Sequence, residues 1–162
     1  MKVLRTIRFD ASDEHVFSTA AGPDEWAISG TFAFHHLNPD TLSGKEKQAF
    51  SNGFLGLESF GRATFVSVGE ADEAAYEEQV ERLAGHLLAD WGAPNAEAAR
   101  GAARHELDFA RELAEGQPLN TLLAVSRHFD DEGQMREAVR IVTPPTEKQH
   151  ARIWDVVEAN DA

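Results

Sequence analysis

The sequence predicts an α+β fold in which helices pack on an antiparallel or mixed sheet of about five strands. Two patterns support this class: short segments alternate apolar and polar side chains as strands do, and longer segments repeat apolar residues every three or four positions as helices do. The segments follow one another in the order ββαβααββα. With 162 residues and no internal repeat or linker, the chain is expected to form a single domain over residues 1–162.

Two strands are predicted near the N-terminus. Residues 2–9 alternate apolar and polar side chains and are expected to form the first strand. Residues 26–34 alternate as well, and the apolar side chains that share a face there are Trp26, Ile28, Phe32 and Phe34. This second strand is expected to pair with the first.

A helix is predicted to begin at Ser43. Ser43 and Glu46 have the spacing of a capping box, in which each side chain bonds the backbone amide of the other residue. Asn52 and Gly53 tolerate the left-handed backbone that often ends a helix, so the helix is expected to stop there.

The segment between Gly53 and Gly61 is predicted to be a buried turn. It is rich in glycine, and it also carries the large apolar residues Phe54, Leu55, Leu57 and Phe60. Because a surface loop does not usually carry so many large apolar side chains, the turn is expected to pack inside the protein. Residues 62–68 are rich in β-branched types and are predicted to form the third strand.

Two helices and a β-hairpin are predicted next. The first helix spans residues 72–91, and its apolar stripe consists of Tyr76, Val80, Leu83, Leu87 and Trp91. The second runs from a cap at Asn95 to about Glu115, and its inward-facing residues are Ala99, Ala103, Leu107, Ala110 and Leu113. The short connection predicts an α-hairpin. Residues 121–129 and 134–142 then read as strands joined by a turn at 130–133.

The C-terminal segment 144–162 is predicted to be a helical extension after Pro144 and Pro145. Ile153, Trp154 and Val157 share one face of this helix. That face either completes the core of the same domain or binds a protein partner or a second copy of the chain. Packing on the same domain is favoured, because exposed tryptophan stripes are rare in monomers.

The chain is strongly acidic, and this narrows the classes of partner. It has 28 Asp and Glu against 15 Lys and Arg, a formal net charge of -13. Such a charge repels phosphate backbones and anionic lipids, so neither nucleic acid nor a membrane is expected as a partner. The chain has no cysteine, which excludes thiolate chemistry. No apolar run resembles a signal peptide or a membrane span, so a cytoplasmic location is expected.

No complete catalytic, cofactor or metal motif is present. His105, Asp108 and Glu112 form the best row of metal-ligand residue types, but they lack the spacing of strong sites, so a solvated surface is favoured. Ser59 lies in the glycine-rich turn without the sequence of a nucleophile elbow. We therefore predict no catalytic residue, no metal ligand and no cofactor.

Arginines on predicted strands are the remaining candidates for a binding site. The positions are Arg5 or Arg8, Arg62, Arg127 and Arg140. Two of them on one face could hold an anion, although pairing with carboxylates of the same chain is favoured. If the protein has a ligand pocket, we expect it beside the turn 53–61. There Glu58 and Arg62, with His36 as a neighbour, would orient a polar or anionic ligand.

Three segments resemble a known family. They are Leu4–Asp10 with Ser12 and Asp13 (LRTIRFDxSD), Glu25–Ala27 (EWA) and Gly53–Gly61 (GFLGLESFG). Together they resemble a family of small proteobacterial proteins known only as a domain of unknown function. The family has no assigned activity, and thus no functional residues to transfer. Its members are often encoded near molybdenum-dependent oxidoreductases, which implies a role in their maturation or assembly.

Three functions follow as hypotheses. The first is a non-catalytic accessory or binding protein that engages a protein partner, with assembly of a molybdenum-dependent oxidoreductase as the role that the resemblance implies. The second is a small-molecule-binding protein or enzyme with a pocket beside the turn 53–61. The third and weakest is a metal-binding protein that uses histidines and carboxylates.

Overall fold

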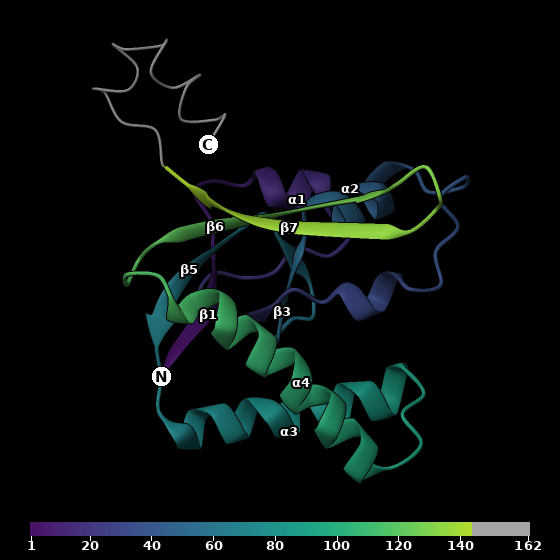
Figure 1. Cartoon of the computed structure of the whole chain (residues 1–162). Coiled ribbons are helices and arrows are strands. Elements are labelled where there is room, and N and C mark those ends of the chain that lie inside the picture. Colours follow the sequence, from purple (N-terminus) through teal and green to yellow (C-terminus); the bar gives the residue numbers. More distant parts are fainter. Residues whose placement is uncertain (144–162) are drawn as a thin grey trace, which may run out of the picture.

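Two antiparallel sheets form the centre of the structure, a computed structural model that describes residues 1–143 (Figure 1). The larger sheet has the order β1-β5-β6-β7 and the smaller one the order β2-β3-β4. The strands are β1 (Lys2–Ile7), β2 (Ala27–Ile28), β3 (Phe54–Gly56), β4 (Arg62–Ala63), β5 (Phe65–Glu70), β6 (Leu122–Phe129) and β7 (Met135–Val142). The predicted α+β class is confirmed, but the strands of the described part of the chain are divided between two sheets.

Helices cover the sheets on two sides. They are α1 (Ser12–Val16), the 3₁₀ helix η1 (Thr31–Phe34), α2 (Gly44–Asn52), α3 (Glu73–Asp90) and α4 (Ala96–Glu115). The predicted hairpin of α3 and α4 is confirmed, and Figure 1 shows it on the side of the sheets away from α1 and α2. Helix α4 packs on β1 and β2, whereas α2 packs on β6. The sheets therefore lie between the hairpin on one side and α1 and α2 on the other (Figure 1), while β7 remains largely exposed.

The predicted strand over residues 26–34 is largely wrong. Only Ala27 and Ile28 form a strand, which pairs with β3, and Trp26 makes a single bridge to Arg5 of β1. Gly30 has a left-handed backbone with φ of 69°, and the chain then turns into η1. Because a strand cannot continue through that conformation, Phe32 and Phe34 lie on a helix instead.

The predicted strand over residues 62–68 is divided between the two sheets. Arg62 and Ala63 pair with β3, and the chain joins the larger sheet from Phe65 onward. Thr64 lies at the crossing, where its hydroxyl donates a hydrogen bond to the buried carboxylate of Asp13, 2.7 Å away. Asp13 belongs to α1, a short helix that the sequence patterns did not predict.

Both ends of α2 are at the predicted residues, but for different reasons. Ser43 is the residue before the helix, yet its side chain makes no capping hydrogen bond, so the predicted capping box does not form. Gly53 follows the helix with an extended backbone, φ of -98°. Glycine is required there by space, because a Cβ would lie 2.8 Å from the carbonyl oxygen of Ala49 and 3.0 Å from Cδ of Arg62.

The core confirms the predicted burial of the glycine-rich segment. Phe54 is 0% exposed and Leu57 is 1% exposed, and both belong to the same cluster as the buried side chains of α3 and α4. From the predicted stripe of α3, the buried members are Tyr76, Val80, Leu83 and Leu87. The segment therefore joins the smaller sheet to the helical hairpin.

Replacing Gly30 with alanine is expected to lower the free energy of unfolding by about 2 kcal/mol or more, because of left-handed strain and overpacking. A Cβ at this position would lie 2.5 Å from Cβ of Leu55 and 2.8 Å from Nη1 of Arg62. Urea denaturation measures the change. Gly85 on α3 is the matched control: nothing lies within 4 Å of a Cβ there, so alanine should leave stability unchanged or raise it. Equal effects at the two glycines would contradict the prediction.

The C-terminal extension 144–162, with Ile153, Trp154 and Val157, lies outside the described residues. Its predicted contact with the core or with a partner therefore stays a prediction. Within residues 1–143, none of the helices combines the length and the apolar character that crossing a membrane requires.

Candidate functional site

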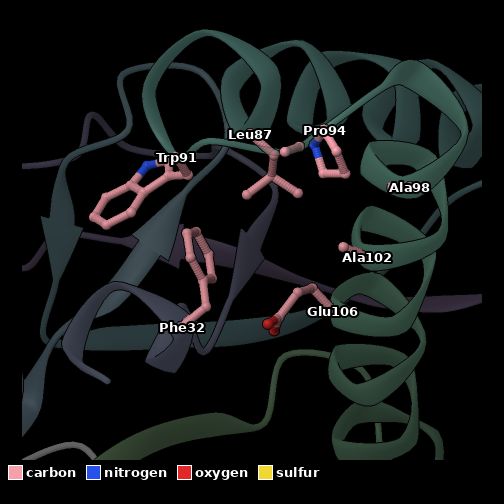
Figure 2. Close-up of a pocket in the computed structure, with 8 residues that line it drawn as sticks. Phe32, Leu87, Trp91, Pro94, Ala98, Ala102 and Glu106 are labelled. Carbon is pink, nitrogen blue, oxygen red and sulfur yellow. The ribbon is translucent and has the colours of Figure 1, made fainter. Parts of the chain in front are cut away.

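A pocket of about 320 Å³ opens between η1 and the hairpin of α3 and α4 (Figure 2). It is lined by Phe32, Leu87, Trp91, Ala93, Pro94, Ala98, Ala102 and Glu106. All of these side chains are apolar except Glu106. Ligand pockets in proteins are typically lined in this way, with a small number of polar groups among apolar and aromatic side chains. The size and the lining therefore suit a small organic molecule.

Glu106 is the ionisable group of this pocket. In Figure 2 its carboxylate extends from α4 into the open space, on the side toward Phe32. Burial raises the pKa of Glu106, and the negative charge of Glu137 raises it further, while the positive charges of His105 and Arg127 oppose the shift. A half-buried carboxyl group with a raised pKa inside a pocket is typical of a functional site.

Trp91 is held in place by a short chain of hydrogen bonds. Its indole Nε1 donates to Nε2 of His86 at 3.0 Å, and Nδ1 of His86 lies 3.1 Å from a carboxylate oxygen of Asp90. His86 is also stacked on Phe60 from the glycine-rich turn, with ring centroids 3.8 Å apart. Burial lowers the pKa of His86, although Asp90 opposes the shift.

The Asp90–His86 pair resembles a catalytic dyad, but its geometry does not suit acid–base catalysis. A general base needs a free lone pair, and the lone pair on Nε2 of His86 already accepts the indole N–H of Trp91. The neutral imidazole then carries its proton on Nδ1 and donates it to Asp90. The pair therefore fixes the indole as part of the pocket lining, where Trp91 remains 41% exposed.

Two buried arginines meet beneath η1. Arg62 donates from its guanidinium to the carbonyl oxygens of Ser29, Gly30 and Gly53, at 3.1 to 3.3 Å. Arg127 donates to the carbonyl oxygens of Ser29 and Gly53 as well, at 2.6 and 3.0 Å. Both guanidinium groups also lie over the ring of Phe34.

The two arginines differ in their charged partners. Arg127 donates to a carboxylate oxygen of Glu137 at 2.7 Å. The bonds recorded for Arg62 within residues 1–143 go to main-chain carbonyls. Burial, and next the positive charge of Arg127, lowers the pKa of Arg62 to about 9, so Arg62 remains protonated at neutral pH. Because these donors already have acceptors inside the protein, the arrangement ties η1 to the strands.

A buried carboxylate organises the glycine-rich turn. Glu25 is 4% exposed, and its Oε1 accepts hydrogen bonds from the backbone N–H groups of Glu58 and Ser59 and from the Ser59 hydroxyl. Its other carboxylate oxygen accepts from the N–H of Gly22. A Cβ at Gly56 would lie 2.5 Å from Oε1 of Glu25, so glycine is needed there to admit the carboxylate. Ser59 thus has a structural role in the turn.

The residues predicted to bind a ligand occupy different environments. Arg62 is buried beneath η1, Glu58 is exposed on the turn, and His36 is exposed after η1. His36 lies near the pocket, since its ring is 6.2 Å from that of Trp91. None of the three lines the pocket of Figure 2. Their role in binding a ligand stays a prediction.

The residues predicted as the best metal-ligand row make other contacts. Asp108 accepts a hydrogen bond from the hydroxyl of Tyr76 at 2.7 Å and lies 3.6 Å from Arg111. Across residues 1–143, no three side chains of the histidine and carboxylate types gather closely enough to hold a metal ion.

Three residues of the pocket are not predicted from the sequence patterns. Phe32 is expected on a strand, Trp91 is expected in a buried stripe, and Glu106 belongs to no predicted site. A usable signal lies on α4, where Ala98, Ala102 and Glu106 recur every four residues on one face. The two alanines leave room beside the helix, and Glu106 places one charge at the end of this row of three residues.

Comparisons with curated proteins and with solved structures each found no match. A comparison with protein families matched residues 1–156 to a family of unknown function, DUF6505. This agrees with the uncharacterised family that the three sequence segments suggest. The chain therefore belongs to the DUF6505 family of unknown function.

Proposed function

We propose that the protein is a non-catalytic binding protein that holds a small apolar or aromatic molecule in the pocket between η1 and the α3–α4 hairpin. The observation that carries this proposal is the pocket itself, about 320 Å³ of space with apolar walls and one carboxyl group. Its volume is within the usual range for ligand sites, which starts near roughly 300 Å³. The absence of a second free acid or base among the lining residues favours binding over catalysis.

A small aromatic alcohol, 2-phenylethanol, is a suitable first probe because it matches the apolar walls and carries no charge. Wild-type protein is expected to bind it with chemical-shift changes in the amides of η1 and of the α3–α4 connection. Replacing Ala102 with leucine should abolish this binding, because the larger side chain fills the pocket. Leucine is also a good helix former, so the fold should persist.

The control for this variant is Ala74, which is exposed on α3 and is not among the lining residues. Ala74→Leu makes the same chemical change outside the pocket and should leave the binding of 2-phenylethanol unaltered. The proposal would be refuted if Ala102→Leu still binds 2-phenylethanol, or if the chemical-shift changes occur at amides far from η1 and the α3–α4 connection. The measurement is a two-dimensional NMR titration.

The accessory role, in which the protein engages a protein partner, is a separate proposal. Leu88 on α3 and Trp91 directly after this helix are each 41% exposed, and exposed apolar side chains of this kind suit a protein partner or a second copy. The cytoplasmic location, the proteobacterial origin and the assembly of a molybdenum-dependent oxidoreductase stay predictions. Mass measurement at high protein concentration, together with affinity capture from cells, tests whether a partner or a second copy is bound.

A further inference from the structure

We propose that the pocket selects an organic ammonium ion, whose charged group lies between the Glu106 carboxylate and the rings of Phe32 and Trp91 while its apolar body fills the remaining space. This inference rests on the proposed binding function and names the chemical class of the ligand.

Within residues 1–143 no salt bridge to the carboxylate of Glu106 is found, and the positive charges of His105 and Arg127 only partly offset the cost of its burial. The pKa of Glu106 is shifted by burial and by charges that are not hydrogen-bonded to it, and no residue of the described part of the chain donates a hydrogen bond to its carboxylate. Burial of a carboxylate without a counter-ion disfavours its charged form. A cation that enters the pocket and pairs with it relieves this cost, whereas a ligand carboxylate would increase it.

The aromatic rings supply a second attraction for a cation. Phe32 and Trp91 have ring centroids 5.4 Å apart and meet at 86°, so their faces point in different directions around one corner of the pocket. Figure 2 shows Phe32 between Trp91 and the carboxylate of Glu106. Aromatic faces attract ammonium groups, and tryptophan does so most strongly. The pocket therefore brings aromatic side chains and a carboxylate together (Figure 2), and both can attract the same charged group.

The apolar part of the ligand has a separate place. Leu87, Pro94, Ala98 and Ala102 line the side of the pocket formed by the helical hairpin. These side chains carry no polar group that could orient a second charge. The pocket therefore suits a molecule with one charged end and an apolar or aromatic body.

The surrounding charges favour a cation as well. The positive charges that act on Glu106 are those of His105 and Arg127, and Arg127 is already paired with Glu137 and bonded to main-chain carbonyls. The chain as a whole has a formal charge of -13, which draws cations toward its surface and repels anions.

Three probes with the same aromatic body separate charge from shape: 2-phenylethylammonium, 2-phenylethanol and 3-phenylpropionate. Titration calorimetry on wild-type protein is expected to show the ammonium ion binding at least about tenfold more tightly than the alcohol, with the carboxylate weakest. The differences in affinity among the three probes should become smaller as salt is added, because the preference is electrostatic.

Glu106→Gln tests the residue. The variant should bind the ammonium ion and the alcohol with similar affinity, while its affinity for the alcohol stays close to that of the wild type. Glu112→Gln is the matched control, since Glu112 is exposed on the same helix and the substitution removes the same charge. It should keep the preference for the ammonium ion.

The outcomes distinguish this inference from the proposed function. Equal binding of the ammonium ion and the alcohol by wild-type protein, or a preference that survives Glu106→Gln, overturns the inference while leaving the pocket as a binding site. Failure of all three probes to bind overturns the proposed function itself. The comparison of probes on wild-type protein remains decisive even if Glu106→Gln does not fold.

Discussion

Replacing Arg127 with methionine is expected to lower the free energy of unfolding by about 3–5 kcal/mol, the cost typical of removing one partner from a buried ion pair. The side chain of Arg127 is 0% exposed, and its guanidinium donates to the carbonyl oxygens of Ser29, Phe50 and Gly53. Methionine has a similar length but no donor, so the carbonyl of Phe50 loses this buried bond and the carbonyls of Ser29 and Gly53 keep only their bonds from Arg62. Equilibrium unfolding in urea measures the loss.

The ion pair adds to this effect. Glu137 accepts hydrogen bonds from Arg127 and from the hydroxyl of Thr31 on η1. Removing the arginine therefore leaves the Glu137 carboxylate with the Thr31 hydroxyl as its donor and without the paired positive charge. Arg127→Lys should recover part of the stability, because it restores the charge without the planar set of donors. The order of stability is then expected to be wild type, lysine variant, methionine variant.

Arg140 provides the control for Arg127. It is exposed on β7, and Arg140→Met removes the same charge from the same sheet. Its effect should stay within about 0.5 kcal/mol, as for most surface substitutions. If Arg127→Met costs no more than Arg140→Met, the buried network contributes nothing measurable, and the explanation given for η1 is wrong.

The elements that were predicted correctly are those whose structure depends on residues close to one another in the sequence. The stripe of α3 contains Val80 and Leu83 at helical spacing, and both are 0% exposed. Asn95 caps α4 as expected, because its side chain accepts a hydrogen bond from the N–H of Ala98. The turn between β6 and β7 forms at Asp130 to Gly133, where glycine adopts φ of 78°. Each of these features depends on residues within a few positions of one another.

The 3₁₀ helix η1 depends on distant residues, which is why the sequence patterns missed it. Alternating apolar residues over 26–34 suit a strand, but the carbonyls of Ser29 and Gly30 bond to arginines that lie 32 to 98 residues further along the chain. A strand at these residues would need the same carbonyls for a neighbouring strand. No local pattern reveals that Arg62 and Arg127 take that role.

The pocket was missed for a related reason. Helical spacing placed Trp91 in the buried stripe, but α3 ends at Asp90, and Gly92 then adopts a left-handed backbone with φ of 72°. The indole is therefore directed toward Phe32 and not along the stripe. Because Phe32 itself comes from the unexpected helix η1, one wall of the pocket could not be placed before the fold was known.

Glu25→Gln is expected to lower the free energy of unfolding by about 3 kcal/mol, since hydrogen bonds to a charged acceptor contribute about 1.5–3 kcal/mol each. The carboxylate accepts from the N–H groups of Gly22, Glu58 and Ser59. An amide side chain would direct its NH₂ group against at least one of these donors, and the close approach of Gly56 leaves little space to turn away. Urea unfolding gives the energy, and hydrogen exchange at Glu58 and Ser59 should show the turn opening locally.

The same substitution should also weaken ligand binding, because the turn supports the pocket. Phe60 of this turn stacks on His86, and His86 accepts the hydrogen bond that orients Trp91. The control is Glu58→Gln, which changes an exposed side chain of the same turn while keeping the backbone N–H that Glu25 accepts. It should alter neither stability nor the affinity for 2-phenylethanol. If the Glu25→Gln protein folds and binds 2-phenylethanol with normal affinity, then Trp91 keeps its position without the intact turn. The contact between Phe60 and His86 would then not be needed to position Trp91.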